Sequence, residues 1–239
     1  MKRQKLGQHY LVDERTVGMI VGFADVQPSE RVLEIGTGRG ALTKQLANRG
    51  TSLLGYEVDE ENYETTLEAV RGTKARIELA DPFMLDPKFD VLVTSLPYSE
   101  SAKFIKWLSA RRFDRAVAVL QEDFVKKVTA RPGDRDYRGI SAVAQIALQV
   151  RVLAKVERAA FYPPPRVASV VASFTPKRKL SEEEVAAVIR LFSIRRREVD
   201  SALAKLGIGR SRSFGKRRVF SLTPEEVYEI CSRLSTVRL

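Results

Sequence analysis

Four residues at the end of an apolar run, Ser95-Leu96-Pro97-Tyr98, place a hydroxyl, a proline and an aromatic ring one after another. A polar side chain and a carbonyl oxygen beside an aromatic face can hold a flat, hydrogen-bonding ring such as a nucleobase. Pro97 favours this geometry because it fixes φ and has no N–H of its own. Tyr98 could also pack as an edge aromatic on the helix that follows. The tetrapeptide therefore predicts either a base-holding turn or a structural one.

Three glycines, Gly36, Gly38 and Gly40, lie between a strand-like run and a helix-like segment. Glycines at such a junction let the backbone turn sharply and approach a ligand closely. The spacing is GxGxG, because Ala41 stands where a dinucleotide fingerprint has its third glycine. Glu34 just before the loop is also unfavourable for a pyrophosphate. The pattern favours a ligand whose charged part is an amino acid.

Two carboxylates follow at the ends of the next strand-like runs. Glu57 is placed to accept hydrogen bonds from ribose hydroxyls, and Asp81 can accept one from the exocyclic amine of an adenine. The carboxyl ends of parallel strands meet at one edge of a sheet, so these residues and the glycines mark a common crevice. Each alone could be a structural turn or solvated surface. Together they favour S-adenosylmethionine over NAD.

The elements that must position these residues alternate along the first three quarters of the chain. Strand-like runs cover 31–35, 52–58, 75–79, 89–95, 115–121, 150–157 and 168–176. Helix-like spacing covers 13–26, 40–49, 60–71 and 100–110. This alternation predicts an α/β fold with a seven-stranded, mostly parallel sheet covered on both faces. The last two strands have no helix between them, so we expect them to pair antiparallel at the sheet edge.

Beyond residue 176 the pattern becomes helical and basic. Ser181 and Glu184 form a capping box, and Thr223-Pro224 opens a further helix. Residues 177–239 hold 15 Lys and Arg against 8 Asp and Glu, a net +7 of the chain's +11. We therefore predict two domains, an α/β domain at 1–176 and a small all-α domain at 177–239.

The basic bias has two interpretations. It attracts polyanions such as RNA, DNA or an anionic membrane surface, or it reflects a thermophilic composition, with Asn present only at Asn48 and Asn62. The basic runs of the C-terminal part could be a solvated helix face, but with Phe214 interleaved they better suit phosphate contacts. The candidate RNA-binding residues are Arg195, Arg196, Arg197, Lys216, Arg217 and Arg218.

Other features limit the class of protein. Cys231 is the single cysteine, so no internal disulfide is expected and a cytoplasmic location fits. No apolar segment approaches the roughly 18 residues of a membrane span, and the N-terminus lacks the apolar region of a signal peptide. The single histidine, His9, agrees with a reaction that does not depend on acid–base catalysis. We expect a monomer without a metal and without a membrane partner.

Seven segments, in order, resemble the rRNA adenine N6,N6-dimethyltransferases of the small-subunit type and the related erythromycin-resistance methyltransferases. They are KLGQHYL (5–11), EIGTGRGALT (34–43), YEVD (56–59), SLPY (95–98), VLQEDFVKKVTARPGDRDYRGIS (119–141), AFYPPPRVASVV (160–171) and LFSIRRREVDSAL (191–203). The resemblance implies a Rossmann-like class I methyltransferase domain at 1–176. It also implies a basic helical rRNA-recognition domain at 177–239.

The resemblance implies S-adenosyl-L-methionine as cofactor and assigns roles residue by residue. The implied cofactor contacts are His9, Leu11, Gly36, Gly38, Glu57, Asp81 and Ser95. The implied catalytic group is Ser95, Leu96, Pro97, Tyr98 and Phe161. Phe161 would be a second aromatic face for the base, although it could instead be a core anchor. The implied reaction methylates N6 of two adjacent adenines near the 3′ end of small-subunit rRNA during biogenesis of that subunit.

Two positions depart from the family pattern, because Ser95 stands where the family has Asn and His9 where many members have Asn. Acceptors on both N6 hydrogens localise the lone pair that attacks the methyl group, and a serine reaches less far than Asn. Losing one such contact costs about 1–3 kcal/mol, which slows transfer by roughly 5- to 150-fold. Ser95 therefore leaves open a second hypothesis, in which the protein is a catalytically weakened or inactive family member that acts as an rRNA-binding ribosome-assembly factor. A DNA adenine methyltransferase is a weaker alternative, against which the matches at 160–171 and 191–203 argue.

Overall fold

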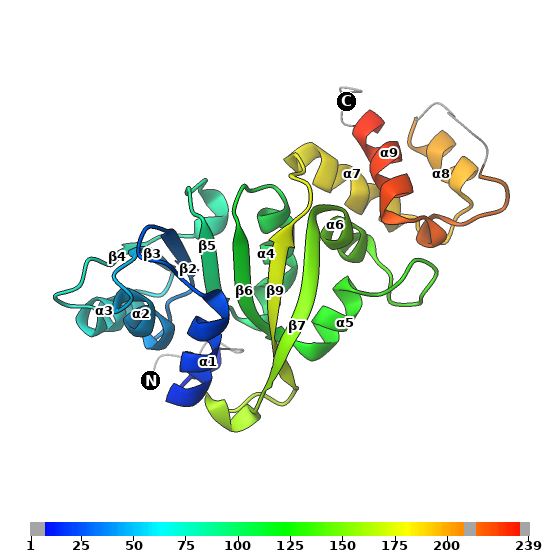
Figure 1. Cartoon of the computed structure of the whole chain (residues 1–239). Helices are drawn as coiled ribbons and strands as arrows, with labels where there is room; N and C mark the ends of the chain where they lie inside the picture. Colours follow the sequence, from blue (N-terminus) through cyan, green and yellow to red (C-terminus); the bar gives the residue numbers. More distant parts are fainter. Residues whose placement is uncertain (1–7, 208–213, 235–239) are drawn as a thin grey trace. The chain divides into compact units, whose positions relative to one another are not determined.

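The computed structural model describes residues 8–207 and 214–234 of the chain. It divides into two compact units (Figure 1). The first unit comprises residues 1–104, 112–124 and 151–176, and the second comprises 105–111, 125–150 and 177–239. The second unit thus contains the predicted C-terminal domain together with two segments from earlier in the chain.

A seven-stranded sheet runs through the first unit in the order β4-β3-β2-β5-β6-β9-β7 (Figure 1). The strands are β2 (Arg31–Ile35), β3 (Ser52–Glu57), β4 (Arg76–Leu79), β5 (Val91–Ser95), β6 (Arg115–Gln121), β7 (Leu148–Val156) and β9 (Ser169–Pro176). Neighbours from β4 to β6 are parallel, whereas β9 runs antiparallel to β6. The predicted fold class is confirmed, and β9 lies between β6 and the edge strand β7.

The central strands form because they are apolar almost without interruption, as strands covered on both faces must be. Val91, Leu92 and Val93 of β5 are fully buried. The helices that alternate with these strands are α1 (Glu14–Ala24), α2 (Ala41–Ala47), α3 (Glu60–Ala69) and α4 (Ser101–Ser109). Asp13 caps the start of helix α1, and its side chain accepts a hydrogen bond from the Thr16 N–H.

A second, two-stranded sheet was not predicted from the sequence. Strand β1 (Tyr10–Leu11) pairs antiparallel with β8 (Phe161–Tyr162), with Tyr10 opposite Tyr162 and Leu11 opposite Phe161. The N–H of Val12 continues the pairing by donating to the Ala160 carbonyl oxygen over 2.9 Å. Residues at the start of the chain are therefore tied to the segment just before β9.

Helices make up most of the second unit within the described residues. They are α5 (Glu122–Val128, which starts in the first unit), α6 (Gly139–Ala147), α7 (Glu182–Ser193), α8 (Val199–Lys205) and α9 (Pro224–Leu234). The predicted capping box at Ser181 is confirmed at the start of α7. In the core of this unit the rings of Tyr137 and Phe192 meet edge to face, with 5.4 Å between centroids. Short 3-10 turns occur at Pro82–Met84, Tyr98–Glu100, Arg158–Ala160 and Val219–Ser221.

Two kinds of structural feature are absent from the described residues. No helix there is both long enough and apolar enough to cross a membrane. Nor does any group of three His, Cys, Asp or Glu side chains in this part of the chain have the arrangement of a metal site.

Candidate functional site

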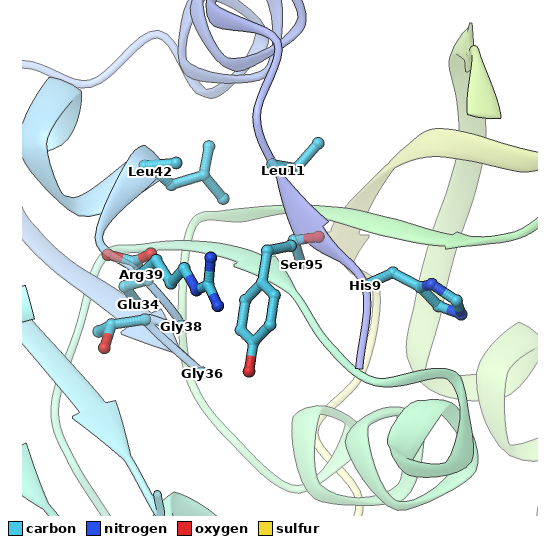
Figure 2. A pocket seen from close by; sticks show the side chains of 11 residues that line it. His9, Leu11, Glu34, Gly36, Gly38, Arg39, Leu42 and Ser95 are labelled. Carbon is cyan, nitrogen blue, oxygen red and sulfur yellow. The ribbon is translucent and has the colours of Figure 1, made fainter. Parts of the chain in front are cut away.

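A hollow lies at the carboxyl end of β2, in the first unit (Figure 2). In Figure 2 the glycine-loop residues Gly36, Gly38 and Arg39 border one side of it, and His9, Leu11 and Ser95 border the other. The full lining is His9, Tyr10, Leu11, Glu34, Gly36, Thr37, Gly38, Arg39, Ala41, Leu42 and Ser95. The structure therefore brings together five of the seven predicted cofactor residues, and leaves Glu57 and Asp81 outside the lining.

The glycine loop after β2 turns back on itself through left-handed backbone. The φ angles of Gly36, Gly38 and Gly40 are +72°, +57° and +80°, a region that other residues rarely adopt. At Gly38 a Cβ atom would also lie only 3.4 Å from the Tyr10 ring. The Tyr10 ring therefore lies against the loop, and the positive φ is what restricts position 38 to glycine.

The side chain of Glu57 is hydrogen-bonded to this loop. Its carboxylate accepts hydrogen bonds from the N–H groups of Gly38 at 2.8 Å, Val58 at 2.8 Å and Asp59 at 3.0 Å. The side chain is buried, and the residue ends β3 as predicted. The geometry gives Glu57 a structural task, holding the loop at Gly38. Because a carboxylate has about four acceptor sites, it keeps room for one further donor.

Glu34 is a site residue that the sequence analysis treated only as an argument against a pyrophosphate. It is fully buried, its two carboxyl oxygens have no hydrogen-bond partner, and it lines the hollow. Burial raises its pKa to about 8; the nearby Thr43 hydroxyl acts in the opposite direction, and the charge of Glu57 adds to the rise. The sequence signal that could have identified Glu34 as a site residue is its charge within an apolar strand that leads into the glycine loop.

Asp81 lies outside the hollow and already has partners. It follows β4, and its carboxylate accepts from the Phe83 N–H and from the Lys103 ammonium, each over 2.9 Å. Burial would raise the pKa of Asp81, but the Lys103 ammonium and the Phe83 N–H together hold it below the ordinary value. An adenine amine at this position would therefore share the carboxylate with Lys103.

The tetrapeptide after β5 forms a rigid turn. Leu96 is buried and Pro97 precedes a short 3-10 turn that contains Tyr98. The Tyr98 hydroxyl lies 2.6 Å from that of Ser169 on β9, and burial raises its pKa while this hydrogen bond lowers it, with a net rise. The ring is also tilted by 36° against that of His9, with 5.5 Å between centroids. Both ends of the tyrosine side chain are therefore held.

His9 joins this turn to the hollow. It lines the hollow, packs on Tyr98, and its Nδ1 lies 2.7 Å from the Pro163 carbonyl oxygen. A carbonyl oxygen can only accept, so Nδ1 carries the proton and donates. His9 is therefore fixed by the loop that precedes β9.

Phe161 lies in the apolar core of the first unit and is only 3% exposed. The structure thus places it as the core anchor that the sequence left open, because β1 covers it on pairing with β8. Its neighbour Tyr162 is 60% exposed and is the aromatic side chain that this strand presents to solvent. Phe214 is also buried, so it does not interleave with basic residues on the surface.

The two basic runs of the second unit are residues 195–197 and 209–218, and the described part of the second lies beside the first. Backbone hydrogen bonds join Arg195 to Phe220, Arg197 to Val219 and Val199 to Arg217. The exposed members of the predicted RNA-binding set are Arg196, Arg197, Lys216, Arg217 and Arg218, and Arg195 is half-buried.

Arg217 differs from the others, because its guanidinium binds both carboxylate oxygens of Glu226 at 2.7 and 2.8 Å. Residues 208–213, which hold the remaining arginines of the second basic run, lie outside the described part of the chain.

Comparisons with known proteins agree on a family. A family model described as ribosomal RNA adenine dimethylase matches residues 1–238. A probable ribosomal RNA small subunit methyltransferase A from Pyrococcus abyssi is 32% identical over 247 residues, covering 95% of this chain and 89% of that protein.

Two solved structures share the fold. A dimethyladenosine transferase from Plasmodium falciparum superposes with a TM-score of 0.79 at 23% identity, covering 93% of this chain and 96% of that one. The 23S rRNA methyltransferase ErmE superposes with a TM-score of 0.64 at 24% identity, covering 95% and 100%. Because the family model spans nearly the whole chain and the Pyrococcus relative matches along its length, this protein belongs to the ribosomal RNA adenine dimethylase family of S-adenosylmethionine-dependent methyltransferases.

Proposed function

We propose that this protein transfers methyl groups from S-adenosylmethionine to N6 of two adjacent adenines near the 3′ end of small-subunit rRNA, within a precursor of the small ribosomal subunit. The observation that carries the proposal is the rigid Ser95–Tyr98 turn directly beside the glycine-loop hollow. Ser95 belongs to both, so a base held by the turn would lie next to a methyl donor held by the hollow.

The residues around the hollow fit the cofactor. The buried Glu34 carboxyl, which has no partner, suits the ammonium group of its methionine part. Glu57 holds the glycine loop and retains acceptor capacity for a ribose hydroxyl. When bound, the cofactor supplies an electrophilic methyl group on a sulfonium. The remaining work of this site is positioning, and His9 beside the turn has its Nδ1 proton bound to the Pro163 carbonyl oxygen.

The turn fits a flipped adenine. The Ser95 hydroxyl makes no hydrogen bond within the described residues, so it is available to accept from an N6 hydrogen. Tyr98 offers a ring whose orientation is set by Ser169 and His9. Stacking on such a ring would fix the plane of the base and aim its amine at the hollow.

The second unit suits RNA binding. Its two basic runs lie next to each other and present exposed guanidinium and ammonium groups. Such groups bind phosphates without reading sequence, so they would hold the RNA while the first unit acts on the base. In this proposal residues 1–176 carry out the reaction and residues 177–239 recognise the rRNA.

The direct test uses small ribosomal subunits that lack the modification. They are incubated with the protein and labelled cofactor, and methyl groups are then located by mass spectrometry of RNA fragments. We expect N6-methylated adenines in pairs near the 3′ end, and a Tyr98→Ala variant should lose most of the activity. The proposal fails if no adenine N6 receives a methyl group in any subunit preparation.

Ser95 itself favours a second candidate, an rRNA-binding assembly factor that has lost catalysis. In that case the chain would bind small-subunit precursors but not transfer methyl groups. Calorimetry separates the two, because failure to bind S-adenosylmethionine supports the assembly factor. Tight cofactor binding with turnover supports the enzyme.

A further inference from the structure

An acidic and a basic side chain face the same hollow without pairing with each other. Glu34 is buried beneath it with two unpartnered oxygens, and Arg39 extends along its side from the glycine loop (Figure 2). Among the described residues Arg39 makes no ion pair. A carboxyl group that an approaching ammonium group would ionise, held apart from a guanidinium in one hollow, is complementary to a zwitterion, a ligand that carries both an ammonium and a carboxylate.

The Arg39 guanidinium is nevertheless positioned. Its central carbon lies 4.6 Å from the centroid of the Tyr10 ring, a cation–π contact. The ring is fixed in turn, because the Tyr10 hydroxyl donates to Gln8 Oε1 over 2.8 Å and accepts from Asn62 Nδ2 over 3.4 Å. A guanidinium held in place by an aromatic face loses less conformational entropy when its N–H groups bind a carboxylate.

The cofactor of the proposed reaction is such a zwitterion at its methionine end. We propose that Arg39 binds the carboxylate of the methionine part of S-adenosylmethionine, with Tyr10 orienting the guanidinium, and that this contact selects cofactors with an intact amino-acid end. The inference rests on the proposed function and names a specificity residue that the glycine spacing did not indicate. The ammonium group would favour the ionised form of Glu34, which then supplies the opposite charge.

The chemistry of the ligand allows a direct test. Decarboxylated S-adenosylmethionine keeps the adenosine, the sulfonium and the amine but lacks the carboxylate. Calorimetry would measure the binding of both ligands to the wild-type chain, to Arg39→Gln and to Arg49→Gln. Arg49 is the matched control, since it is an exposed arginine of the same unit that does not line the hollow.

For Arg39→Gln we expect affinity for S-adenosylmethionine to fall by about 10- to 100-fold, as for loss of a charge-assisted hydrogen-bonded pair. Affinity for the decarboxylated ligand should stay within about 3-fold, because the contact is missing from that complex already. Arg49→Gln should leave both affinities unchanged. An Arg39→Lys variant keeps the charge but loses the two parallel N–H donors of the guanidinium. Its affinity for S-adenosylmethionine should lie between those of wild type and Arg39→Gln, and its affinity for the decarboxylated ligand should not change.

Several results would overturn the inference. Equal losses for both ligands would mean that Arg39 acts on the shape of the loop, and unchanged cofactor affinity with weakened RNA binding would make it a phosphate contact. A wild-type chain that binds neither ligand would overturn the proposed function as well. An Arg39→Gln variant that binds S-adenosylmethionine as tightly as wild type overturns this inference alone.

Discussion

The buried carboxyl of Glu34 connects the chemistry of the site to the stability of the chain. In the folded protein its pKa is about 8, against an ordinary value of 4.5, because burial disfavours the ionised form. A group with a raised folded pKa contributes stability that is complete below its unfolded pKa. That contribution is lost as pH rises toward its folded pKa.

We therefore predict that the free energy of unfolding of wild type falls relative to Glu34→Gln between about pH 5 and pH 8, by about 1.4 kcal/mol per pH unit. Glutamine mimics the protonated carboxyl, and the other titrating groups are common to both proteins. Urea denaturation at several pH values in this window provides the measurement. A difference between the two proteins that stays constant with pH would contradict the raised pKa.

The residue at position 95 is expected to determine the rate of methyl transfer. Replacing it by Asn adds the reach and the amide oxygen that a bound N6 amine needs. We predict that Ser95→Asn transfers methyl groups about 5- to 150-fold faster than wild type in single turnover. Cofactor affinity, measured alongside, should change little. Equal single-turnover rates would show that the serine already holds the amine as well as an amide does.

At the scale of elements, the glycine loop depends on the strand beside it. Gly55 lies in the middle of β3, where an added Cβ would be 2.7 Å from Thr37 Cγ2 and 2.8 Å from Ile77 Cδ1. Both distances are below van der Waals contact, so Thr37 of the loop and Ile77 of β4 would have to move. A methyl group on this strand would therefore disturb the loop as well as the sheet.

We predict that Gly55→Ala destabilises the protein by about 1–3 kcal/mol and weakens cofactor binding. Gly22 in α1 is the matched control, because an added Cβ there meets no atom within 4 Å. Gly22→Ala should stabilise by about 0.5–1 kcal/mol through helix propensity. Thermal unfolding of both variants checks the opposite signs. Two changes of the same sign would refute the overlap argument.

The elements themselves were largely predictable, and the reason is physical. Parallel strands buried on both faces form continuous apolar runs, so 31–35 and 115–121 were predicted with the bounds the structure has. The pairing of β1 with β8 left no such signal, since two-residue strands far apart in the sequence have no periodicity. Burial of Phe214 was missed, and that of Phe161 was left open, because a single aromatic residue does not reveal which way it faces.

The partners of the site residues were harder to predict than the residues. The sequence indicated Glu57 and Asp81 as ligand acceptors, yet the structure shows that their carboxylates also bind the glycine loop and Lys103. Such contacts depend on atoms brought together by folding. The uses of Glu34 and Arg39 became visible only when the hollow between them was known.

At the scale of the whole molecule, net charge governs the encounter with RNA. Each exposed cation that contacts a phosphate contributes about 0.7–0.9 to the slope of log affinity against log salt. We predict that Arg196→Gln and Arg197→Gln each weaken rRNA-fragment binding and reduce this slope by about that amount. Filter binding at several salt concentrations measures both effects.

Arg217→Gln is the matched control from the same surface. Its guanidinium is paired with Glu226 and also donates to the Ser221 carbonyl oxygen over 2.8 Å. Removing it should lower thermal stability slightly and leave the salt slope nearly unchanged, because a paired arginine has less charge to offer a phosphate. A drop in slope equal to that of Arg196→Gln would mean that RNA displaces Glu226.

The pairing of β1 with β8 bears on whether the RNA substrate dissociates between two methyl transfers. His9 packs on the tyrosine that would hold the adenine, while Tyr10 and Leu11 of β1, which follow it directly, border the cofactor hollow. Each methyl group consumes one cofactor, so an adenine that receives two methyl groups requires an exchange in between. If that exchange moves β1, it also loosens the grip on the base. Monomethylated adenine should then accumulate early in the reaction as a released intermediate, making the enzyme distributive rather than processive.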